Sequence, residues 1–440
     1  MMKDYPETLL EVTTALRSGK IDLQDYINSI CDRIDERDSR IQALVPETGR
    51  RERLLWEAAE LEKKYPLTGN RPPLFGVLVG IKDIFRVDGF PTRAGSKLPA
   101  HLFDGAQARC VTRLREAGAL ILGKTVTTEF AYFAPGPTRN PHNLAHTPGG
   151  SSSGSAAAVA AGFCPLAVGT QTVGSVIRPA AFCGITGYKP SYDRISTEGL
   201  LYYSRSLDHV GLFTRDAAGM LLAAAVVCRD WEQDRAAANM TLPVLGVPEG
   251  PYLKQAPAGT LAAFEEYLLR LVEAGCTVKR IPALENIEEI NRRHNRLGAA
   301  EMAREHEKLF AEYEGLYRER TADLIREGKE VSAEEVEEGK KSRGLLRTEL
   351  EGLMDENGLD LWVSPPSTGE APAGIESTGN PIMNLPWTHA GLPTVTLPAG
   401  RGKKGLPLGL QFSARFMADE MLLAWAVKLE ELLAYDKQTP

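Results

Sequence analysis

Serine and lysine residues suited to acyl transfer lie in two short segments of the chain. The segment from Gly149 to Pro190 is rich in serine, glycine and alanine and has Gly–Ser steps at Ser151 and Ser175. Glycine lets backbone N–H groups approach a ligand, and N–H groups that point one way can bind an oxyanion. The run LFGVLVGI has the pattern of a buried strand and is followed by Lys82. Burial lowers the pKa of lysine, so this side chain could be neutral and act as a base. As a base it could remove the proton of a serine hydroxyl and so make that serine nucleophilic.

The motifs around these residues resemble those of the amidase signature family. In order along the chain they are PLFGVLVGIKD, GGSS-x-G-S-A-A-A-V-A-A-G, G-T-x-T-x-G-S, R-P-A-A-F-C-G, G-Y-K-P, AGLPTVTLPAG and LPLGLQF. The resemblance is strong over residues 74–216 and moderate over residues 362–430. It implies a hydrolase that cleaves a C–N bond next to a carbonyl group through an acyl-serine intermediate, with no cofactor and no metal ion.

The resemblance also implies a role for each member of a Ser–Ser–Lys triad. Ser175 is expected to be the nucleophile, Ser151 the bridging serine, and Lys82 the base that receives the proton through Ser151. The peptide bond between Gly150 and Ser151 is expected to be cis. The backbone N–H groups expected to bind the oxyanion are those of Thr172, Val173, Gly174 and Ser175.

Three departures from the commonest family pattern lie around the nucleophile. Gln171 stands where an acid is commonest, Val173 replaces a glycine, and Ile177 replaces an arginine. An arginine follows one position later, at Arg178, and the Q-T-x-G-S-x-I-R-P pattern resembles the malonamidase-like branch. The planar guanidinium of Arg178 suits a carboxylate or carbonyl group of the substrate. A structural ion pair is the alternative interpretation of this arginine.

The residues that could shape the substrate pocket are mainly aromatic or apolar, as is usual for small-molecule sites. The substrate could be an amide, a carbamate or a urea-type compound, because the triad would treat these carbonyl groups alike. The residues selected on these grounds, in addition to Arg178, are Tyr132, Phe133, Ile177, Phe182, Trp387 and His389.

Other functions have weaker support in the sequence. Residues 118–125 match the phosphate-binding pattern G-x-x-x-x-G-K-T, but that pattern should follow a strand and open a helix, and here a helix precedes it and a strand lies within it. Residues 150–154 match G-x-S-x-G, which would make Ser152 an esterase nucleophile with His209 or His389 as base. The residues before Ser152 are typical of a loop, whereas such a nucleophile follows a buried strand. The A subunit of a glutamine-dependent amidotransferase, such as the glutamyl-tRNA type, is the third alternative, and the intact triad disfavours a non-catalytic binding protein.

Composition favours a soluble enzyme with a small-molecule substrate. The 58 acidic residues exceed the 51 basic ones, so the net charge of −7 disfavours nucleic-acid binding. The apolar runs are far shorter than the roughly 20 residues of a membrane span, and the first residues do not resemble a signal peptide. We therefore expect a cytoplasmic monomer or homodimer. The six cysteines show no metal-ligand spacing and are expected to be buried: Cys31, Cys110, Cys164, Cys183, Cys228 and Cys276.

The order of apolar patterns predicts a single large α/β domain, with a central mixed sheet covered by helices on both faces. Residues 1–65 are expected to form N-terminal helices and residues 66–230 the core with the triad. Residues 231–358 are expected to add strands and a charged helical segment, and residues 359–440 to complete the same domain. The charged segment at 286–356 is most simply interpreted as a solvated helical face. The alternative is a cap over the mouth of the active site.

Overall fold

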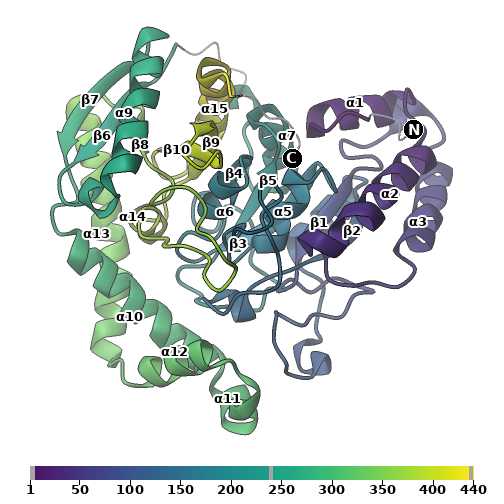
Figure 1. The fold of residues 1–440 in the computed structure, drawn as a ribbon, viewed down its shortest axis with the longest axis horizontal. Coiled ribbons are helices and arrows are strands. Elements are labelled where there is room, and N and C mark those ends of the chain that lie inside the picture. Colours follow the sequence, from purple (N-terminus) through teal and green to yellow (C-terminus); the bar gives the residue numbers. More distant parts are fainter. Residues whose placement is uncertain (1–4, 237–240, 436–439) are drawn as a thin grey trace.

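The computed structural model describes residues 5–236, 241–435 and 440 of the chain. Its strands join in one sheet of ten, in the order β2-β1-β3-β5-β4-β9-β10-β8-β6-β7 (Figure 1). The strands are β1 (Leu78–Lys82), β2 (Leu120–Thr125), β3 (Leu166–Gln171), β4 (Thr186–Lys189), β5 (His209–Thr214), β6 (Val244–Glu249), β7 (Thr277–Pro282), β8 (Leu361–Ser364), β9 (Thr394–Arg401) and β10 (Pro407–Ser413).

Helices precede, connect and follow these strands. They are α1 (Leu9–Ser18), α2 (Leu23–Ile41), α3 (Arg50–Lys64), α4 (Arg109–Glu116), α5 (Ser153–Ala160), α6 (Ile177–Phe182), α7 (Ala217–Val227), α8 (Gln233–Ala236), α9 (Ala258–Glu273), α10 (Ile287–Glu305), α11 (Glu307–Tyr313), α12 (Glu319–Lys329), α13 (Ala333–Asn357), α14 (Leu385–His389) and α15 (Asp419–Leu433).

The sheet is mixed, and both of its faces are buried. Strands β1, β2 and β3 run parallel at one end and β6, β7 and β8 at the other, while the pairs between them are antiparallel. Successive side chains of a strand point to opposite faces. Along β3, Leu166 and Val168 enter the larger apolar cluster with α7 and α15, whereas Ala167 enters the second cluster with α2 and α5. The predicted α/β fold with a mixed sheet covered on both faces is confirmed.

Three strands bring the residues of the predicted site to one edge of the sheet. β1 and β3 are parallel, so Lys82 at the end of β1 lies beside the last residues of β3, where it contacts Thr170. β5 is antiparallel to β3, and its first residue, His209, pairs with Gln171. The residue before β5, Asp208, therefore reaches the same edge from the opposite direction.

The charged segment forms four helices beside this edge. In Figure 1, α10 and α12 extend away from the sheet towards α11, and α10 also packs on α13 and α14. Ser332 begins α13 with a capping box in which Glu335 reciprocates. Exposed charges cover the outer surfaces of these helices, but α10 also buries apolar residues such as Leu297 and Met302 in the core.

Candidate active site

Lys82 is fully buried at the end of β1. The apolar residues before it form this strand and place its side chain beside the serine-rich segment. Its Nζ donates hydrogen bonds to Ser151 Oγ and to Thr170 Oγ1, each over 2.8 Å. The neighbouring acid, Asp83, does not pair with it. Asp83 instead forms a buried ion pair with Lys124, with 2.9 Å between Oδ1 and Nζ. Among the residues that the structure describes, the amine of Lys82 therefore bonds to two hydroxyl groups and to no carboxylate.

Burial lowers the pKa of Lys82 to about 7, and the charge of Asp208 opposes this change. A lysine with such a pKa is largely neutral in mildly alkaline solution and can act as a general base there. Two hydrogen atoms of a neutral amine can bond to acceptors such as Thr170, which leaves its lone pair free to face Ser151. The electrostatics thus match the role that the sequence predicts for Lys82.

The serine-rich segment is held against the sheet by close packing. The peptide bond between Gly150 and Ser151 is cis, as expected. Ser152 lies in front of α5, and its Oγ donates to the carbonyl of Thr170 over 3.1 Å. At Gly154 a Cβ atom would lie 2.2 Å from the carbonyl oxygen of Ala43. Only glycine allows α5 to lie this close to the chain beside it.

Residues 172–175, here called the oxyanion loop, connect β3 to α6. Gln171 supports the loop because its Oε1 accepts hydrogen bonds from the N–H groups of Val176 (2.8 Å) and Ile177 (2.9 Å). Its Nε2 donates to Thr388 Oγ1 over 2.9 Å, and Thr388 Oγ1 donates to the carbonyl of Val173 over 2.7 Å. An uncharged glutamine thus satisfies the N–H groups at the start of α6.

The predicted oxyanion donors are available. Within the described part of the chain, the N–H groups of Thr172, Val173, Gly174 and Ser175 donate to no backbone acceptor. Backbone donors without an internal partner can stabilise the charge that develops on a carbonyl oxygen. The backbone N–H of Val173 does not depend on its side chain, which forms part of the pocket wall.

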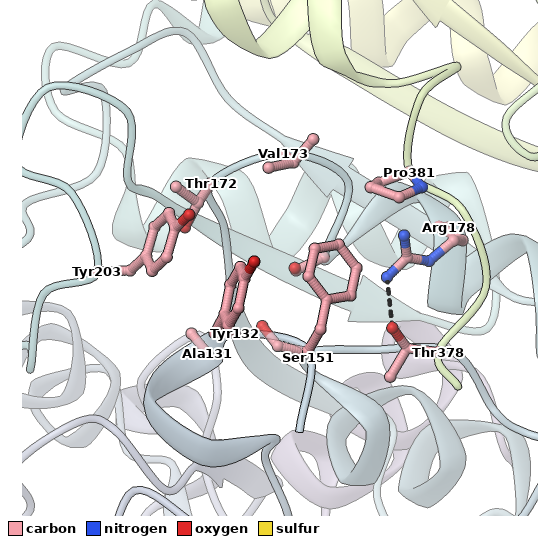
Figure 2. A pocket seen from close by; sticks show the side chains of 11 residues that line it. Ala131, Tyr132, Ser151, Thr172, Val173, Arg178, Tyr203, Thr378 and Pro381 are labelled. Carbon is pink, nitrogen blue, oxygen red and sulfur yellow. Dashed lines mark hydrogen bonds between the residues drawn. The ribbon is translucent and has the colours of Figure 1, made fainter. Parts of the chain in front are cut away.

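An inner pocket of about 20 Å³ brings the two serines together. This volume holds roughly one water molecule. Figure 2 shows the side chains around it, with Tyr132 and Tyr203 on one side and Arg178 and Thr378 on the other. Residues that line the inner pocket are Ala131, Tyr132, Phe133, Ser151, Thr172, Val173, Ser175, Arg178, Tyr203, Thr378 and Pro381.

A second cavity of about 310 Å³, here called the outer chamber, shares walls with the inner pocket. Tyr132 and Tyr203 belong to both, and their rings stack with centroids 5.8 Å apart and an interplanar angle of 10°. Helices α10 and α12 supply the far wall. Their lining residues are Asn291, Asn295, Leu324 and Glu327.

Arg178 is buried, and its contacts are not those of an ion pair. It donates to the carbonyl of Gly150 over 2.6 Å and to Thr378 Oγ1 over 3.1 Å, the bond drawn in Figure 2. Its Nε and Nη1 have no partner among the described residues. Burial without a nearby carboxylate lowers the pKa of Arg178 to about 9. The structural ion pair considered from the sequence is absent from the described residues.

Four of the residues expected in the pocket lie elsewhere, whereas Tyr132, Phe133 and Arg178 do line it. Ile177 is buried at the start of α6, and Phe182 packs in a small cluster with Ala371 and Leu406. Trp387 donates its indole N–H to Tyr252 in the core. These apolar side chains serve the core because α6 and α14 turn them away from the pocket.

His389 also lies behind the pocket wall. Its Nδ1 is 3.2 Å from Nδ1 of His294, and its Nε2 is 2.8 Å from Ser342 Oγ. His209 is buried, and its Nδ1 contacts the carbonyl of Leu207. Neither histidine that could have served Ser152 as a base makes a hydrogen bond to it within the described residues. The arrangement gives no support to an esterase based on Ser152.

The match of residues 118–125 to the phosphate-binding pattern does not correspond to a phosphate-binding loop, as the sequence indicated. The glycines lie before and within strand β2, and Lys124 is buried with its Nζ bonded to Asp83 and to the carbonyl of Phe85. All six cysteines are free and buried. Among the described residues, no group of three or more His, Cys, Asp or Glu side chains could hold a metal ion.

Sequence reasoning did not identify several residues that build the site. Thr170 bonds to Lys82, and Thr388 bonds to Val173 in the oxyanion loop. Tyr203 and Thr378 line the inner pocket. Thr170 lies inside the G-T-x-T-x-G-S motif, so its place near the nucleophile was visible in the sequence. Nothing local marks Thr388 or Thr378, because they reach the site from distant parts of the chain.

Comparison with known proteins gives the class of this protein. A family model described as amidase matches residues 25–423, and the chain belongs to this family. A solved structure of an amidase is 30% identical, with a TM-score of 0.86 over 96% of this chain and 99% of that one. The protein is therefore a hydrolase of the amidase signature family, and its fold is the fold of that family.

The curated relatives include parts of amidotransferases. The A subunit of the glutamyl-tRNA(Gln) amidotransferase of Salinibacter ruber (strain DSM 13855 / M31) is 34% identical over 346 residues, which cover 73% of this chain and 64% of that protein. The A subunit of the same enzyme from Trichlorobacter lovleyi (strain ATCC BAA-1151 / DSM 17278 / SZ) is 30% identical, over 98% of both chains. No helix in the described ranges is long and apolar enough to cross a membrane.

Proposed function

We propose that this enzyme hydrolyses the carbonyl C–N bond of a small-molecule amide, or of a carbamate, through an acyl intermediate on Ser175. The observation that carries the proposal is the 2.8 Å contact between Lys82 Nζ and Ser151 Oγ, beside a pocket that both serines line. Incubation with a slow amide or carbamate substrate, followed by mass spectrometry of peptides, tests it. An acyl group on Ser175 is the expected result, and an acyl group on Ser152 would contradict it.

The proposed reaction begins with attack of Ser175 Oγ on the substrate carbonyl carbon. Its proton passes to Ser151 as Ser151 gives its own proton to neutral Lys82. The N–H groups of the oxyanion loop stabilise the tetrahedral oxyanion. Lys82 then returns a proton through Ser151 to the leaving nitrogen, the C–N bond breaks, and an amine departs. A water molecule then gives a proton through Ser151 to Lys82 and attacks the acyl carbon. Lys82 returns that proton through Ser151 to Ser175 Oγ, the ester C–O bond breaks, and the acid product leaves the free enzyme.

The rate of this reaction is expected to rise with pH through about 7, the pKa of Lys82. Below that pH the amine is protonated and cannot accept a proton, and above it the neutral fraction approaches one. Each unit of pH below the pKa should lower kcat/KM about tenfold. Initial rates from pH 5 to 9 measure the effect. A rate that is constant from pH 5 to 7 and falls above 8 would exclude a neutral-lysine base.

We further propose that Arg178 binds an acidic or strongly polar group of the substrate. A buried guanidinium with two unpartnered nitrogens is costly to maintain without an anionic partner. A carboxylate could accept hydrogen bonds from two guanidinium nitrogens at once. Because the inner pocket is small, this group must lie close to the carbonyl that is attacked. Assignment to the malonamidase-like branch stays a prediction.

Arg178→Met is expected to lower kcat/KM selectively for acidic substrates. A charge-assisted hydrogen bond contributes about 1.5–3 kcal/mol, so the selective loss should be roughly ten- to a hundredfold. Methionine fills much of the same volume, and a matched pair of substrates, one with a carboxylate and one with its neutral methyl ester, provides the comparison. An equal loss on both substrates together with a lower melting temperature would assign Arg178 to structure.

The outer chamber fits the leaving group of the proposed reaction. The amine must leave while the acyl group stays on Ser175, so it departs towards the larger cavity. On this proposal α10 and α12 act as a cap, because they supply the chamber wall that faces Tyr132 and Tyr203. The inner pocket is tight, so its walls must move as a substrate enters.

A role as the A subunit of an amidotransferase is a second candidate function, favoured by the identity to relatives with that name. The two functions differ in their dependence on partners and on glutamine. Turnover of simple amides by the purified chain would support the hydrolase. Release of ammonia from glutamine only in the presence of partner subunits would support the amidotransferase. A panel of aryl amides, short aliphatic amides, carbamates and glutamine, assayed with the chain alone, separates them.

A further inference from the structure

Asp208 is a buried carboxylate to which the triad mechanism assigns no task. It directly precedes β5, on the edge of the sheet where β1 and β3 end. Its Oδ1 accepts a hydrogen bond from Thr172 Oγ1 over 2.5 Å. Its Oδ2 accepts from the backbone N–H groups of Tyr203 over 2.9 Å and Ser204 over 3.1 Å. One carboxylate thus joins the oxyanion loop to a wall of the inner pocket.

The same segment is tied to the capping helices. Glu301 of α10 accepts hydrogen bonds from the hydroxyl groups of Ser204 and Ser206, each over 2.6 Å, and from the N–H of Ser206 over 2.8 Å. The short segment from Tyr203 to Asp208 therefore connects the catalytic edge of the sheet with α10. Asp208 is the end of this connection that touches the oxyanion loop.

We propose that Asp208 is a positioning residue for amide hydrolysis. It holds the oxyanion loop and Tyr203, which lines the inner pocket, in fixed positions relative to each other, and it places a negative charge near Lys82. The inference rests on the proposed function. It adds a residue to the machinery that acts through Thr172, Tyr203 and Lys82 and does not touch the substrate. Charged hydrogen bonds of this kind are about twice as strong as neutral ones, which suits a site where small displacements matter.

The negative charge of Asp208 affects the pKa of the proposed base, Lys82. It raises the pKa of Lys82, against the lowering caused by burial. Burial in turn raises the pKa of Asp208 to about 6, although its three donors and Lys82 oppose that change. Among the described residues, the charge of Asp208 also contributes, after burial, to raising the pKa of Tyr203 in the same segment and of Tyr192, which follows β4. With Asp208 ionised, the pKa of Lys82 is higher than burial alone would leave it.

Asp208→Asn separates the charge from the geometry. The amide oxygen can still accept from Tyr203 and Ser204, and the amide nitrogen can donate to Thr172 Oγ1. We expect the rising limb of the pH–rate profile to move to lower pH by about one unit, because Lys82 loses the nearby negative charge. The maximal kcat should stay within roughly tenfold of the parent value, since the hydrogen-bond geometry is retained.

Asp419→Asn is the matched control. Asp419 is also a buried carboxylate, and it accepts from Tyr188 Oη, from the N–H of Ser191 and from Ser191 Oγ. Its charge acts on Lys189 and not on Lys82. This variant should lose stability without moving the pH–rate profile. An unchanged profile in Asp208→Asn, or the same shift in both variants, would overturn the proposal.

Thr172→Val and Thr172→Ser keep the proposal testable if Asp208→Asn fails to fold. Valine removes the hydroxyl that Asp208 holds, and serine restores it. We expect kcat of the valine variant to fall about tenfold at nearly constant KM, and the serine variant to recover most of the loss. Equal activity in the two variants would overturn the positioning role. If Ser175→Ala itself retained activity, the proposed function would fail, which is a separate outcome.

Discussion

Ser175→Ala and Lys82→Ala are each expected to lower kcat by roughly 10⁴- to 10⁶-fold, because nucleophile and base act as a unit. Neither change should unfold the protein. Lys82 is buried, with its pKa lowered by that burial, so replacing it removes a group that is costly to charge in the core. Single-turnover rates with an amide substrate and thermal unfolding curves for each variant measure the two effects.

Ser152→Ala is the control for this prediction. Its hydroxyl bonds to the backbone of Thr170, accepting from the N–H over 3.2 Å and donating to the carbonyl over 3.1 Å. Loss of these bonds should lower stability by about 1 kcal/mol and leave substantial activity. An inactive Ser152→Ala beside an active Ser175→Ala would reverse the roles and restore the esterase interpretation.

Ser151→Ala is expected to lower kcat by about 10²- to 10⁴-fold, the usual contribution of a group that transfers protons in the transition state. Ser151 is the only triad hydroxyl to which Lys82 donates in the described residues, so its loss interrupts the path from Ser175 to the base. The nucleophile and the oxyanion donors remain, which is why residual activity should exceed that of Ser175→Ala. Rates at saturating substrate above pH 8, where Lys82 is neutral, isolate this effect.

Ser153→Ala provides the matched comparison. Ser153 is also buried, and within the described ranges its hydroxyl makes one hydrogen bond, to the carbonyl of Ser151 over 3.5 Å. This variant should keep activity within a few-fold of the parent enzyme. The change alters the packing beside Ser151 but removes no hydroxyl from the proposed proton path. A loss in Ser151→Ala no greater than that in Ser153→Ala would show that Ser175 passes its proton to Lys82 without a bridging serine.

The candidate catalytic centre could be predicted from sequence because its residues lie in contiguous segments with strong local signals. An apolar strand ending in Lys82, two glycine–serine steps and a helix of small residues are recognisable one segment at a time. The register of β1 beside β3 then brings the ends of those segments together. The conformation of the Gly150–Ser151 bond came from the family resemblance and not from the residues alone.

The pocket walls could not be predicted in the same way. Tyr132, Phe133 and Arg178 were identified, but Ile177, Phe182, Trp387 and His389 belong to the core. An aromatic side chain has the same sequence signal whether it lines a pocket or packs behind one. Only the direction in which each short helix turns its side chains decides between them.

The sequence by itself determined the fold class, the proposed triad and the position of the oxyanion loop, because strand patterns and glycine-rich turns are local properties. Only the tertiary structure decided what surrounds them. Thr388 and Thr378 reach Val173 and Arg178 from about 200 residues away along the chain. Asp208 likewise accepts a hydrogen bond from Thr172, which lies 36 residues earlier in the chain, and α10 and α12 approach the site from a segment with no recognisable motif. Such contacts depend on how distant elements pack, and no local pattern of residues encodes them.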